Sequence, residues 1–283
     1  MNTVAFRPGN YYVSLSITGT YCELRCPFCK GKYLASMLDA SNPEHLLKIL
    51  NYYYRRGTRG FLISGGFNRD GHLIIKSLHL KIIREFKRNH DVIFSIHSGP
   101  VPNDLLELIW SSEIDFIDFE IPSSNEYLRV VKGLKSHTLN KYFEFMEKAS
   151  SYSKEFIVPH IVLNSIASNV NDELRTIEVI ADFKPRLLVT LVEIRSRNSN
   201  YIDIDRIIKV LRRARELFNE VSLGCMRPNE FKVKYDEVVI KERLVDRVVN
   251  PKVSIIDKLN LKVMSACCGI SRSHFKLFPT LRK

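Results

Sequence analysis

The stretch YYVSLSITGTYCELRCPFCKGKY, from Tyr11 to Tyr33, contains the two features that decide the fold and the site. Its first eight residues, Tyr11–Thr18, alternate and are rich in aromatic and β-branched residues, which predicts a strand. Three of the six cysteines of the chain, Cys22, Cys26 and Cys29, follow immediately. In parallel α/β folds the loops after the strands carry the chemistry, so these cysteines are expected on a functional loop.

Further short β-rich runs alternate with longer segments of helical period along the rest of the chain. Segments such as 42–57 and 203–218 are amphipathic and open with Asn or Asp, as helices do. Eight strands separated by helices favour an α/β fold, a single (β/α)8 TIM-type barrel that is complete or nearly so. The seven later strand candidates are Gly60–Ser64, Val92–Ile96, Ile114–Glu120, Phe156–Leu163, Arg186–Glu193, Glu220–Gly224 and Val245–Val249.

The length and the absence of linkers favour one domain. A chain of 283 residues fits one α/β barrel, which typically needs about 250 residues. No Gly/Ser-rich or Pro-rich hinge interrupts the alternation. We therefore expect a barrel over residues 1–259 and a C-terminal tail over residues 260–283. The tail is basic and bears cysteines, and we expect it to fold over the active-site face.

Composition limits the compartment and the partners. The N-terminus has no signal-peptide pattern and no apolar run is long enough for a membrane span, which predicts a cytoplasmic protein without a membrane partner. In a reducing compartment, clustered cysteines bind metal or perform chemistry. The net charge of +12 favours an anionic partner, although the basic residues are scattered as on ordinary solvated helix faces.

Three thiolates spaced CxxxCxxC suit an iron–sulfur cluster better than zinc. A structural zinc site closes with four ligands, usually as two CxxC pairs, and no second pair follows nearby. A [4Fe–4S] cluster held by three cysteines keeps one iron open for another ligand. The motif therefore indicates a reactive cluster.

At these residues the sequence resembles the radical S-adenosylmethionine superfamily, whose motif is CxxxCxxC with an aromatic residue, here Phe28, before the last cysteine. The resemblance implies that S-adenosylmethionine chelates the open iron of the [4Fe–4S] cluster. It also implies that one electron cleaves the sulfonium to give a 5′-deoxyadenosyl radical. That radical abstracts hydrogen from unactivated C–H bonds, chemistry that requires a cofactor.

Two further sites match the cofactor-binding positions of this family. The stretch SGGF follows the second strand, and Gly65 and Gly66 match the Gly-Gly-Glu-like stretch that holds the methionine amino group, whereas Phe67 departs from it. A Gly-Gly turn can also be merely a turn. In the fourth strand, Asp118 and Glu120 lie two apart and share a face. The resemblance implies that this pair binds the ribose hydroxyls, but carboxylates gather at many barrel mouths.

Histidines near the expected pocket are weaker candidates. His97 ends the third strand and His160 lies within the fifth. His97 is placed to face the pocket and is a candidate catalytic residue, although a structural histidine explains it equally well.

The other three cysteines raise the question of a second cluster. Cys225 follows the seventh strand, and Cys267 and Cys268 are adjacent in the tail. A tail folded over the barrel face would bring them together and allow an auxiliary iron–sulfur cluster. Free cysteines also pack as small buried hydrophobes, which is the alternative. The candidates for an additional, non-cysteine ligand are Ser271, Ser273 and Arg227.

The stretches GCMRP and VPHIVLN and the terminal CC narrow the resemblance to biotin-synthase-related radical enzymes, and most to one component of the two-protein archaeal lipoyl synthase. This implies that sulfur from a sacrificial second cluster enters a protein-bound octanoyl chain. The implied partners are an acidic lipoyl-domain or H-protein carrier, a second radical component and an external electron donor. Long-range attraction between a basic enzyme and an acidic carrier would weaken with salt.

Two other functions remain open from the sequence. The same radical could modify tRNA or a small molecule, although no RNA-binding motif is appended to the chain. A non-enzymatic iron–sulfur protein would not bind S-adenosylmethionine, and it would leave the Gly65–Gly66 turn without a purpose.

Overall fold

Eight parallel strands form the centre of one continuous sheet in the computed structural model, which describes residues 3–194 and 201–281. Each of the eight predicted segments overlaps one of these strands, so this part of the prediction is confirmed. The strands are β2 (Tyr12–Ser16), β4 (Gly60–Ser64), β5 (Ile93–Ile96), β6 (Phe116–Ile121), β7 (Ile157–Leu163), β8 (Leu188–Val192), β9 (Val221–Leu223) and β10 (Arg247–Val249).

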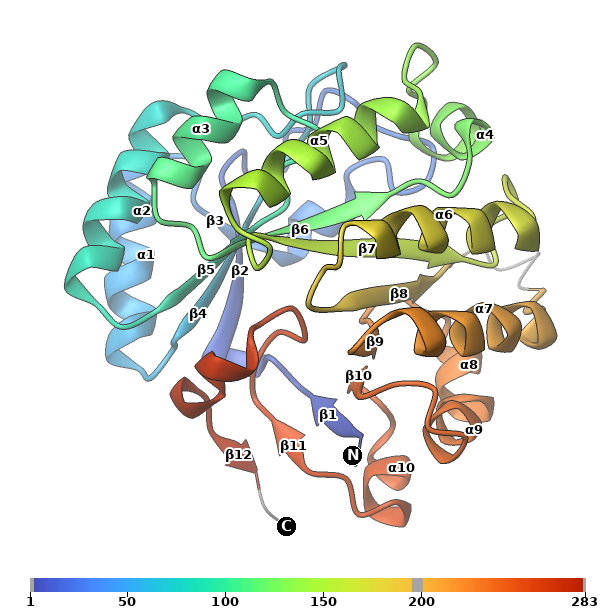
Figure 1. Ribbon diagram of the computed structural model, residues 1–283. Coiled ribbons are helices and arrows are strands. Elements are labelled where there is room, and N and C mark those ends of the chain that lie inside the picture. Colours follow the sequence, from blue (N-terminus) through green and yellow to red (C-terminus); the bar gives the residue numbers. More distant parts are fainter. Residues whose placement is uncertain (1–2, 195–200, 282–283) are drawn as a thin grey trace.

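Helices cover the outer face of this sheet and leave its inner face to the lumen, as Figure 1 shows. The first long helix is capped by Asn42, whose side chain accepts a hydrogen bond from the Glu44 N–H at 2.8 Å. The long helices are α1 (Pro43–Arg55), α2 (Ser77–Asn89), α3 (Asn103–Ser111), α5 (Leu139–Tyr152), α6 (Val170–Asp182) and α7 (Ile204–Leu217). The short ones are α4 (Asn125–Tyr127), α8 (Asn229–Lys234), α9 (Asp236–Lys241) and α10 (Val253–Lys258). No helix in the described residues is long and apolar enough to cross a bilayer.

Four short strands extend the sheet at its two edges. Beside β10 lie β1 (Val4–Phe6), β11 (Val263–Met264) and the antiparallel β12 (Thr280–Leu281). At the other edge, β3 (Leu38–Asp39) pairs with β2. Among the described residues the ladder runs from β12 to β3 without closing. The parallel α/β architecture is as expected, but the barrel is not closed by strand pairing.

Alternating side chains divide the hydrophobic core into two layers. One face of the strands, with Phe61 and Ile63 of β4, packs beneath the helices. The opposite face, with Phe116 of β6 and Val189 of β8, lines the lumen. Because side chains alternate along a strand, the residues that share the lumen with Phe116 are Asp118 and Glu120. Along β6, the polar side chains therefore lie nearer the carboxyl end of the lumen than the apolar Phe116.

The C-terminal tail fills the gap between the two edges of the sheet and part of the lumen (Figure 1). Phe278 stacks on Tyr12 of β2 with ring centroids 5.8 Å apart, and Phe275 contacts Phe6 of β1 at 5.9 Å. Arg247, the first residue of β10, donates to the carbonyls of Cys268 and Ile270. Arg247 lies at the amino end of its strand. The tail therefore does not cover the active-site face as expected; buried guanidinium groups hold it in the opposite half of the lumen.

Candidate active site

The loop after β2 holds its three cysteines close to the end of β4. The Phe67 N–H donates to Cys22 Sγ at 3.4 Å, and the Leu24 N–H donates to the Phe67 carbonyl at 2.8 Å. Within the loop, Cys26 Sγ and Cys29 Sγ lie 3.5 Å apart. Cys26 is buried, whereas Cys22 and Cys29 are partly exposed. The predicted cysteines therefore share one loop at the carboxyl end of the strands, facing solvent on one side.

The Gly65–Gly66 turn permits this approach. A Cβ on Gly66 would lie 1.9 Å from the Tyr21 carbonyl oxygen, so no side chain fits there. The Gly66 N–H donates to Thr18 Oγ1 at 2.6 Å, which ties the turn to the start of the cysteine loop. A Cβ on Gly65 meets only side chains, at 3.1 Å or more. Of the two glycines, Gly66 is therefore the one whose backbone lies directly against the backbone of Tyr21 and Cys22.

The paired thiols of Cys26 and Cys29 differ in acidity. The pKa of Cys26 is lowered to about 6, chiefly because its sulfur accepts a hydrogen bond from Cys29; burial opposes the shift and the charge of Lys132 adds to it. The same hydrogen bond and burial raise the pKa of Cys29. The loop therefore favours a thiolate at Cys26, the form that binds metal.

A lysine that the sequence analysis did not identify stands beside this loop. Lys132 ends the π-helical turn η3 (Leu128–Lys132), and its Nζ lies 2.7 Å from Glu120 Oε1. Tyr127 donates to the same oxygen at 2.8 Å. Burial alone would raise the pKa of Glu120, but the charge and hydrogen bonds of Lys132 and Tyr127 lower it. Burial would lower the pKa of Lys132, and the charge of Glu120 raises it instead. Both side chains are therefore charged.

The turn that carries Lys132 is fastened to the cysteine loop. The Phe28 N–H donates to the Val131 carbonyl at 3.2 Å, next to Lys132. The Phe28 ring packs against Tyr33 with centroids 6.1 Å apart. Phe28 thus fixes the loop by its backbone, and its partly buried ring packs against the core that lines the lumen.

Asp118 and Glu120 share a face of β6, as predicted, but their surroundings differ. Glu120 is partly exposed and bound to Lys132, whereas Asp118 is buried. A Cβ on Gly269 of the tail would lie 2.8 Å from Asp118 Oδ1. On β7, His160 Nε2 lies 3.6 Å from the same oxygen. Glu120 therefore faces the end of the lumen beside the cysteine loop, called the mouth below, and Asp118 faces the tail.

His97 lies at the carboxyl end of β5 and faces the lumen. Its Nδ1 is 3.3 Å from the Oγ of Ser64, which is the last residue of β4. Burial lowers the pKa of His97. The imidazole is therefore neutral near pH 7 and pairs with a hydroxyl group.

The remaining cysteines also meet in the lumen. Cys225 follows β9 and is exposed, Cys267 is partly exposed and Cys268 is buried. A hydrogen bond from Cys267 lowers the pKa of Cys268 to about 7 against the effect of burial. Although Cys225 is exposed as a residue, protein atoms surround its sulfur, and this desolvation and then the negative charge of Cys268 raise the pKa of Cys225. The end of β9 and the tail therefore bring these three thiols within electrostatic reach of one another.

The expected non-cysteine ligands lie elsewhere. Arg227 is buried, with Nε and Nη2 at 2.8 and 2.6 Å from the two carboxylate oxygens of Asp236. Its guanidinium is therefore engaged as a structural ion pair and is not free to act as a ligand. Ser273 Oγ is exposed and donates to Ser271 Oγ at 3.1 Å. These serines pair with each other in the outer part of the tail.

The three cysteines of the loop after β2 have the donor set of a cluster. In the part of the chain that the structure describes, no three His, Cys, Asp or Glu side chains surround one point as ligands of a single ion do. Cysteines of a [4Fe–4S] cluster bind different irons. The Phe67 and Gly31 N–H groups donate to Cys22 and Cys29 at 3.4 and 3.5 Å, the hydrogen bonds to sulfur that tune such clusters. This donor set fits a [4Fe–4S] cluster.

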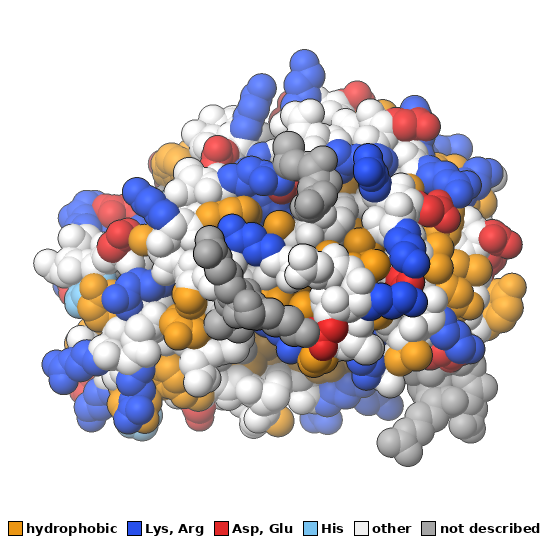
Figure 2. Space-filling view, turned by 90° about the horizontal axis from the view of Figure 1, so that it is seen from below, with side chains coloured by type: hydrophobic (Ala, Val, Ile, Leu, Met, Phe, Trp, Pro, Cys, Tyr) orange, Lys and Arg blue, Asp and Glu red, His pale blue; other side chains and the backbone are white. Residues whose placement is uncertain are grey.

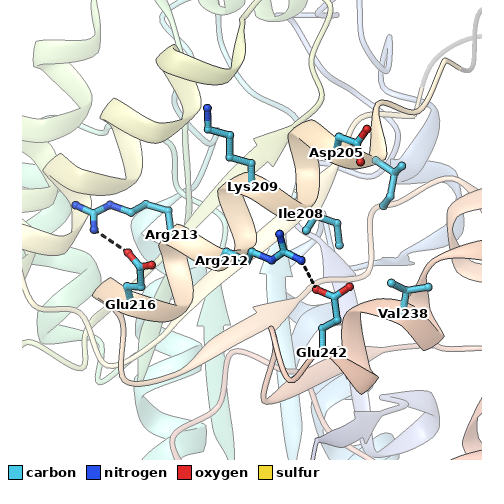
Figure 3. A pocket seen from close by; sticks show the side chains of 9 residues that line it. Asp205, Ile208, Lys209, Arg212, Arg213, Glu216, Val238 and Glu242 are labelled. Atoms are coloured by element: carbon cyan, nitrogen blue, oxygen red, sulfur yellow. Dashed lines mark hydrogen bonds and ion pairs between the residues drawn. The ribbon is translucent and has the colours of Figure 1, made fainter.

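A surface cavity of about 530 Å³ lies between α7 and α9, and no cysteine lines it (Figure 3). Its charged residues pair with one another: Arg212 Nη2 with Glu242 at 2.8 Å, and Arg213 Nη1 with Glu216 at 2.9 Å. These two pairs leave Arg212 and Arg213 engaged with carboxylates of the same cavity. The reactive groups are therefore in the lumen.

Comparison with known proteins agrees with this site. Residues 16–165, which contain the cysteine loop, Gly65–Gly66 and Glu120, match the family model described as the Radical SAM superfamily. A search of the curated proteins found no match. The chain is similar in structure to methylornithine synthase (PylB), at 12% identity and TM-score 0.59, covering 89% of this chain and 82% of that one.

Two other solved structures show how widely the fold is shared. HydG, a maturase of the [FeFe]-hydrogenase, is 9% identical with TM-score 0.63, covering 98% of this chain and 66% of that one. HMG-CoA lyase from Brucella melitensis is 10% identical with TM-score 0.55, covering 98% and 96%. At these identities the similarity concerns the fold alone. The reaction class is therefore inferred from the family match and the cysteine loop.

Proposed function

This chain belongs to the radical SAM superfamily, and from that membership we propose that it inserts sulfur into a C–H bond of a protein-bound octanoyl chain, as one component of a lipoyl synthase. Membership implies a [4Fe–4S] cluster and S-adenosylmethionine. Cys22, Cys26 and Cys29 would hold the cluster. When bound, the cluster and S-adenosylmethionine supply a radical that takes hydrogen from an unactivated carbon.

The observation that carries the sulfur-insertion proposal is the second group of thiols. Cys225, Cys267 and Cys268 come from a strand end and from the tail, yet they interact electrostatically in the same lumen that opens toward the first group. Charge interaction between buried thiols disfavours their ionisation unless a cation or cluster joins them. A sulfur donor held here would face the carbon from which hydrogen is removed.

The other residues of the mouth would bind and orient S-adenosylmethionine. The carbonyls of Gly65 and Gly66 can approach an ammonium group because no side chain intervenes. Lys132 offers a cation for the carboxylate, and Glu120 offers acceptors for ribose hydroxyls; we propose this ribose role for Glu120 alone, because Asp118 faces the tail. Apolar side chains of the tail pack in the lumen.

The charge of +12 supports an acidic lipoyl-domain or H-protein carrier as substrate, with a second radical component and an external electron donor as partners. Figure 2 shows Lys and Arg spread over one face among fewer Asp and Glu, without a single basic block. This distribution suits an acidic protein. It suits tRNA too, so binding of carrier and tRNA should be compared directly at several salt concentrations.

Iron and sulfide content test the proposal. We would reconstitute the protein without oxygen and compare the wild type, a Cys22→Ala/Cys26→Ala/Cys29→Ala triple variant and Cys225→Ala. About 8 irons per chain in the wild type, with about half retained in each variant, is expected for two [4Fe–4S] clusters. About 4 irons, lost entirely in the triple variant, would remove the sulfur-insertion proposal. Formation of 5′-deoxyadenosine then tests the radical reaction itself.

A further inference from the structure

The immediate surroundings of His160 determine which of its ring nitrogens is available. Nδ1 lies 2.9 Å from the carbonyl oxygen of Val158. A carbonyl oxygen only accepts hydrogen bonds, so Nδ1 carries the hydrogen. The other nitrogen, Nε2, then presents its lone pair to the lumen in the neutral ring. A backbone carbonyl that fixes the tautomer in this way is the usual second partner of a metal-binding histidine.

Asp118 faces this lone pair with an acceptor of its own. Its Oδ1 is buried and has no hydrogen-bond partner among the described residues, and its side chain is only 3% exposed. The 3.6 Å between Oδ1 and His160 Nε2 is too long for a hydrogen bond. A buried carboxylate without a partner costs free energy. Two converging acceptors are stabilised when a cation binds both.

The tail brings thiols to the same place. Gly269 passes directly over Asp118, and a Cβ there would lie 2.8 Å from Oδ1. The residues just before it are Cys267 and Cys268, and the Gly269 N–H donates to Cys267 Sγ at 3.5 Å. The charge of Asp118 adds to the hydrogen bonding and burial that raise the pKa of Cys267, adds to the burial that raises the pKa of Cys225, and opposes the lowering of the pKa of Cys268. One carboxylate therefore interacts with all three thiols.

We propose that Asp118 Oδ1 and His160 Nε2 are the two non-cysteine ligands of the second iron centre, with Cys225 and Cys267 as its two cysteine ligands. This inference rests on the proposed function, because it assumes that the second group of cysteines binds iron. It replaces Ser271, Ser273 and Arg227 as candidate ligands. Imidazole ligation raises the reduction potential of an iron–sulfur centre relative to thiolate ligation. The second centre should therefore be reduced more easily than the first.

The test uses the full chain in the Cys22→Ala/Cys26→Ala/Cys29→Ala background, so that only the second centre contributes signals. The protein is reconstituted with iron and sulfide. We add Asp118→Asn or His160→Gln and measure bound iron, sulfide and the EPR spectrum. Replacing a residue that hydrogen-bonds a metal ligand typically lowers the affinity for the metal about 10–100-fold. Replacing a ligand itself should therefore lower the affinity for iron at least about tenfold. Glu120→Gln is the matched control, because Glu120 lies on the same face of β6 but pairs with Lys132.

Loss of iron with Asp118→Asn and His160→Gln, but not with Glu120→Gln, supports the inference. In the background protein, which keeps His160, pulsed EPR of the reduced centre should detect a strongly coupled histidine nitrogen. This measurement does not depend on whether either variant folds. A bound centre without that nitrogen, and unchanged by both variants, overturns the inference and leaves the proposed sulfur insertion intact. If the background itself binds no iron, both proposals are wrong.

Discussion

Lys132 Nζ lies 2.7 Å from Glu120 Oε1, and the charge of the same lysine lowers the pKa of Cys26. One cation therefore acts on the carboxylate of the mouth and on the cysteine loop. It reaches both because the Phe28 N–H holds the Val131 carbonyl at 3.2 Å. The position of Lys132 thus depends on a contact between the loop after β2 and the turn after β6.

Replacing Lys132 by Met should make the first cluster harder to reduce. Reduction adds negative charge, and a nearby cation stabilises it. The reduction potential, measured by EPR-monitored titration, should fall in Lys132→Met and stay close to wild type in Lys132→Arg. The loss of Glu120's partner should cost about 1–3 kcal/mol of unfolding free energy. An unchanged potential in Lys132→Met would contradict the prediction. The Lys132→Met/Glu120→Gln double variant removes both charges of the pair and that cost, so its potential should return toward the wild-type value.

The two glycines of the turn after β4 should tolerate alanine very differently. Gly66→Ala places a Cβ 1.9 Å from the Tyr21 carbonyl oxygen, so the cysteine loop must move. Overpacking of this kind costs about 1–3 kcal/mol. We expect much less iron retained and weaker binding of S-adenosylmethionine by equilibrium dialysis. Gly65→Ala is the control, since its Cβ meets only side chains at 3.1 Å or more; equal losses in both variants would refute the argument.

The spacing of Cys22, Cys26 and Cys29 and the position of that loop after a strand were sufficient to predict the superfamily. The alternation of β-rich and amphipathic segments was likewise sufficient for eight strands. These signals are local, because they depend on neighbouring residues and short periods. Each predicted segment therefore overlaps a strand, with ends that differ by a few residues.

The parts that the sequence did not predict depend on tertiary contacts. Strand β1 has three residues, and only its pairing with β10 and β11 makes it a strand. Lys132 lies in a basic, apolar segment that resembles any surface helix. The tail was expected over the mouth because nothing in its sequence indicates that Arg247 binds its carbonyls. Arg227 was a candidate ligand until Asp236 proved to be its buried partner.

Stability should fall as the pH falls, because of His79. Its pKa is lowered, chiefly by burial, while hydrogen bonding with Ser41 opposes the shift. The unfolded chain, with a histidine pKa of about 6.5, therefore binds more protons than the folded chain once the pH drops below that value. The contribution of His79 to the free energy of unfolding is complete above about pH 6.5 and is lost as the pH falls toward the folded-state pKa. Below that pKa the free energy of unfolding no longer changes because of His79.

The check is chemical denaturation of the wild type and His79→Gln between about pH 7.5 and 5, a range that spans the free histidine pKa. The variant has no ionisable group at position 79, so its free energy of unfolding should depend less on pH. His72, His97 and His137 also have lowered pKa values and will leave a residual slope. Identical slopes in the two proteins would rule out His79 as a source.

Two arginines that bind Glu220 should contribute very different amounts to holding the tail. Arg247 is 1% exposed and donates to Glu220 and to two tail carbonyls, whereas Arg272 is 50% exposed, binds Glu220 and lies over the Phe275 ring at 5.9 Å. Breaking a buried pair costs about 3–5 kcal/mol, because a charge is left without its partner. An exposed pair is worth about 0–1 kcal/mol. Arg247→Met should therefore destabilise the chain far more than Arg272→Met.

The rate at which a thiol reagent modifies Cys268 distinguishes tail release from general instability. Cys268 is buried, and its carbonyl is bound by Arg247. In Arg247→Met, under conditions where the fold is retained by circular dichroism, Cys268 should react much faster, because the tail leaves the lumen. Arg272→Met should protect it as the wild type does. Equal protection in both variants would mean that the apolar contacts of Phe275 and Phe278 hold the tail without Arg247.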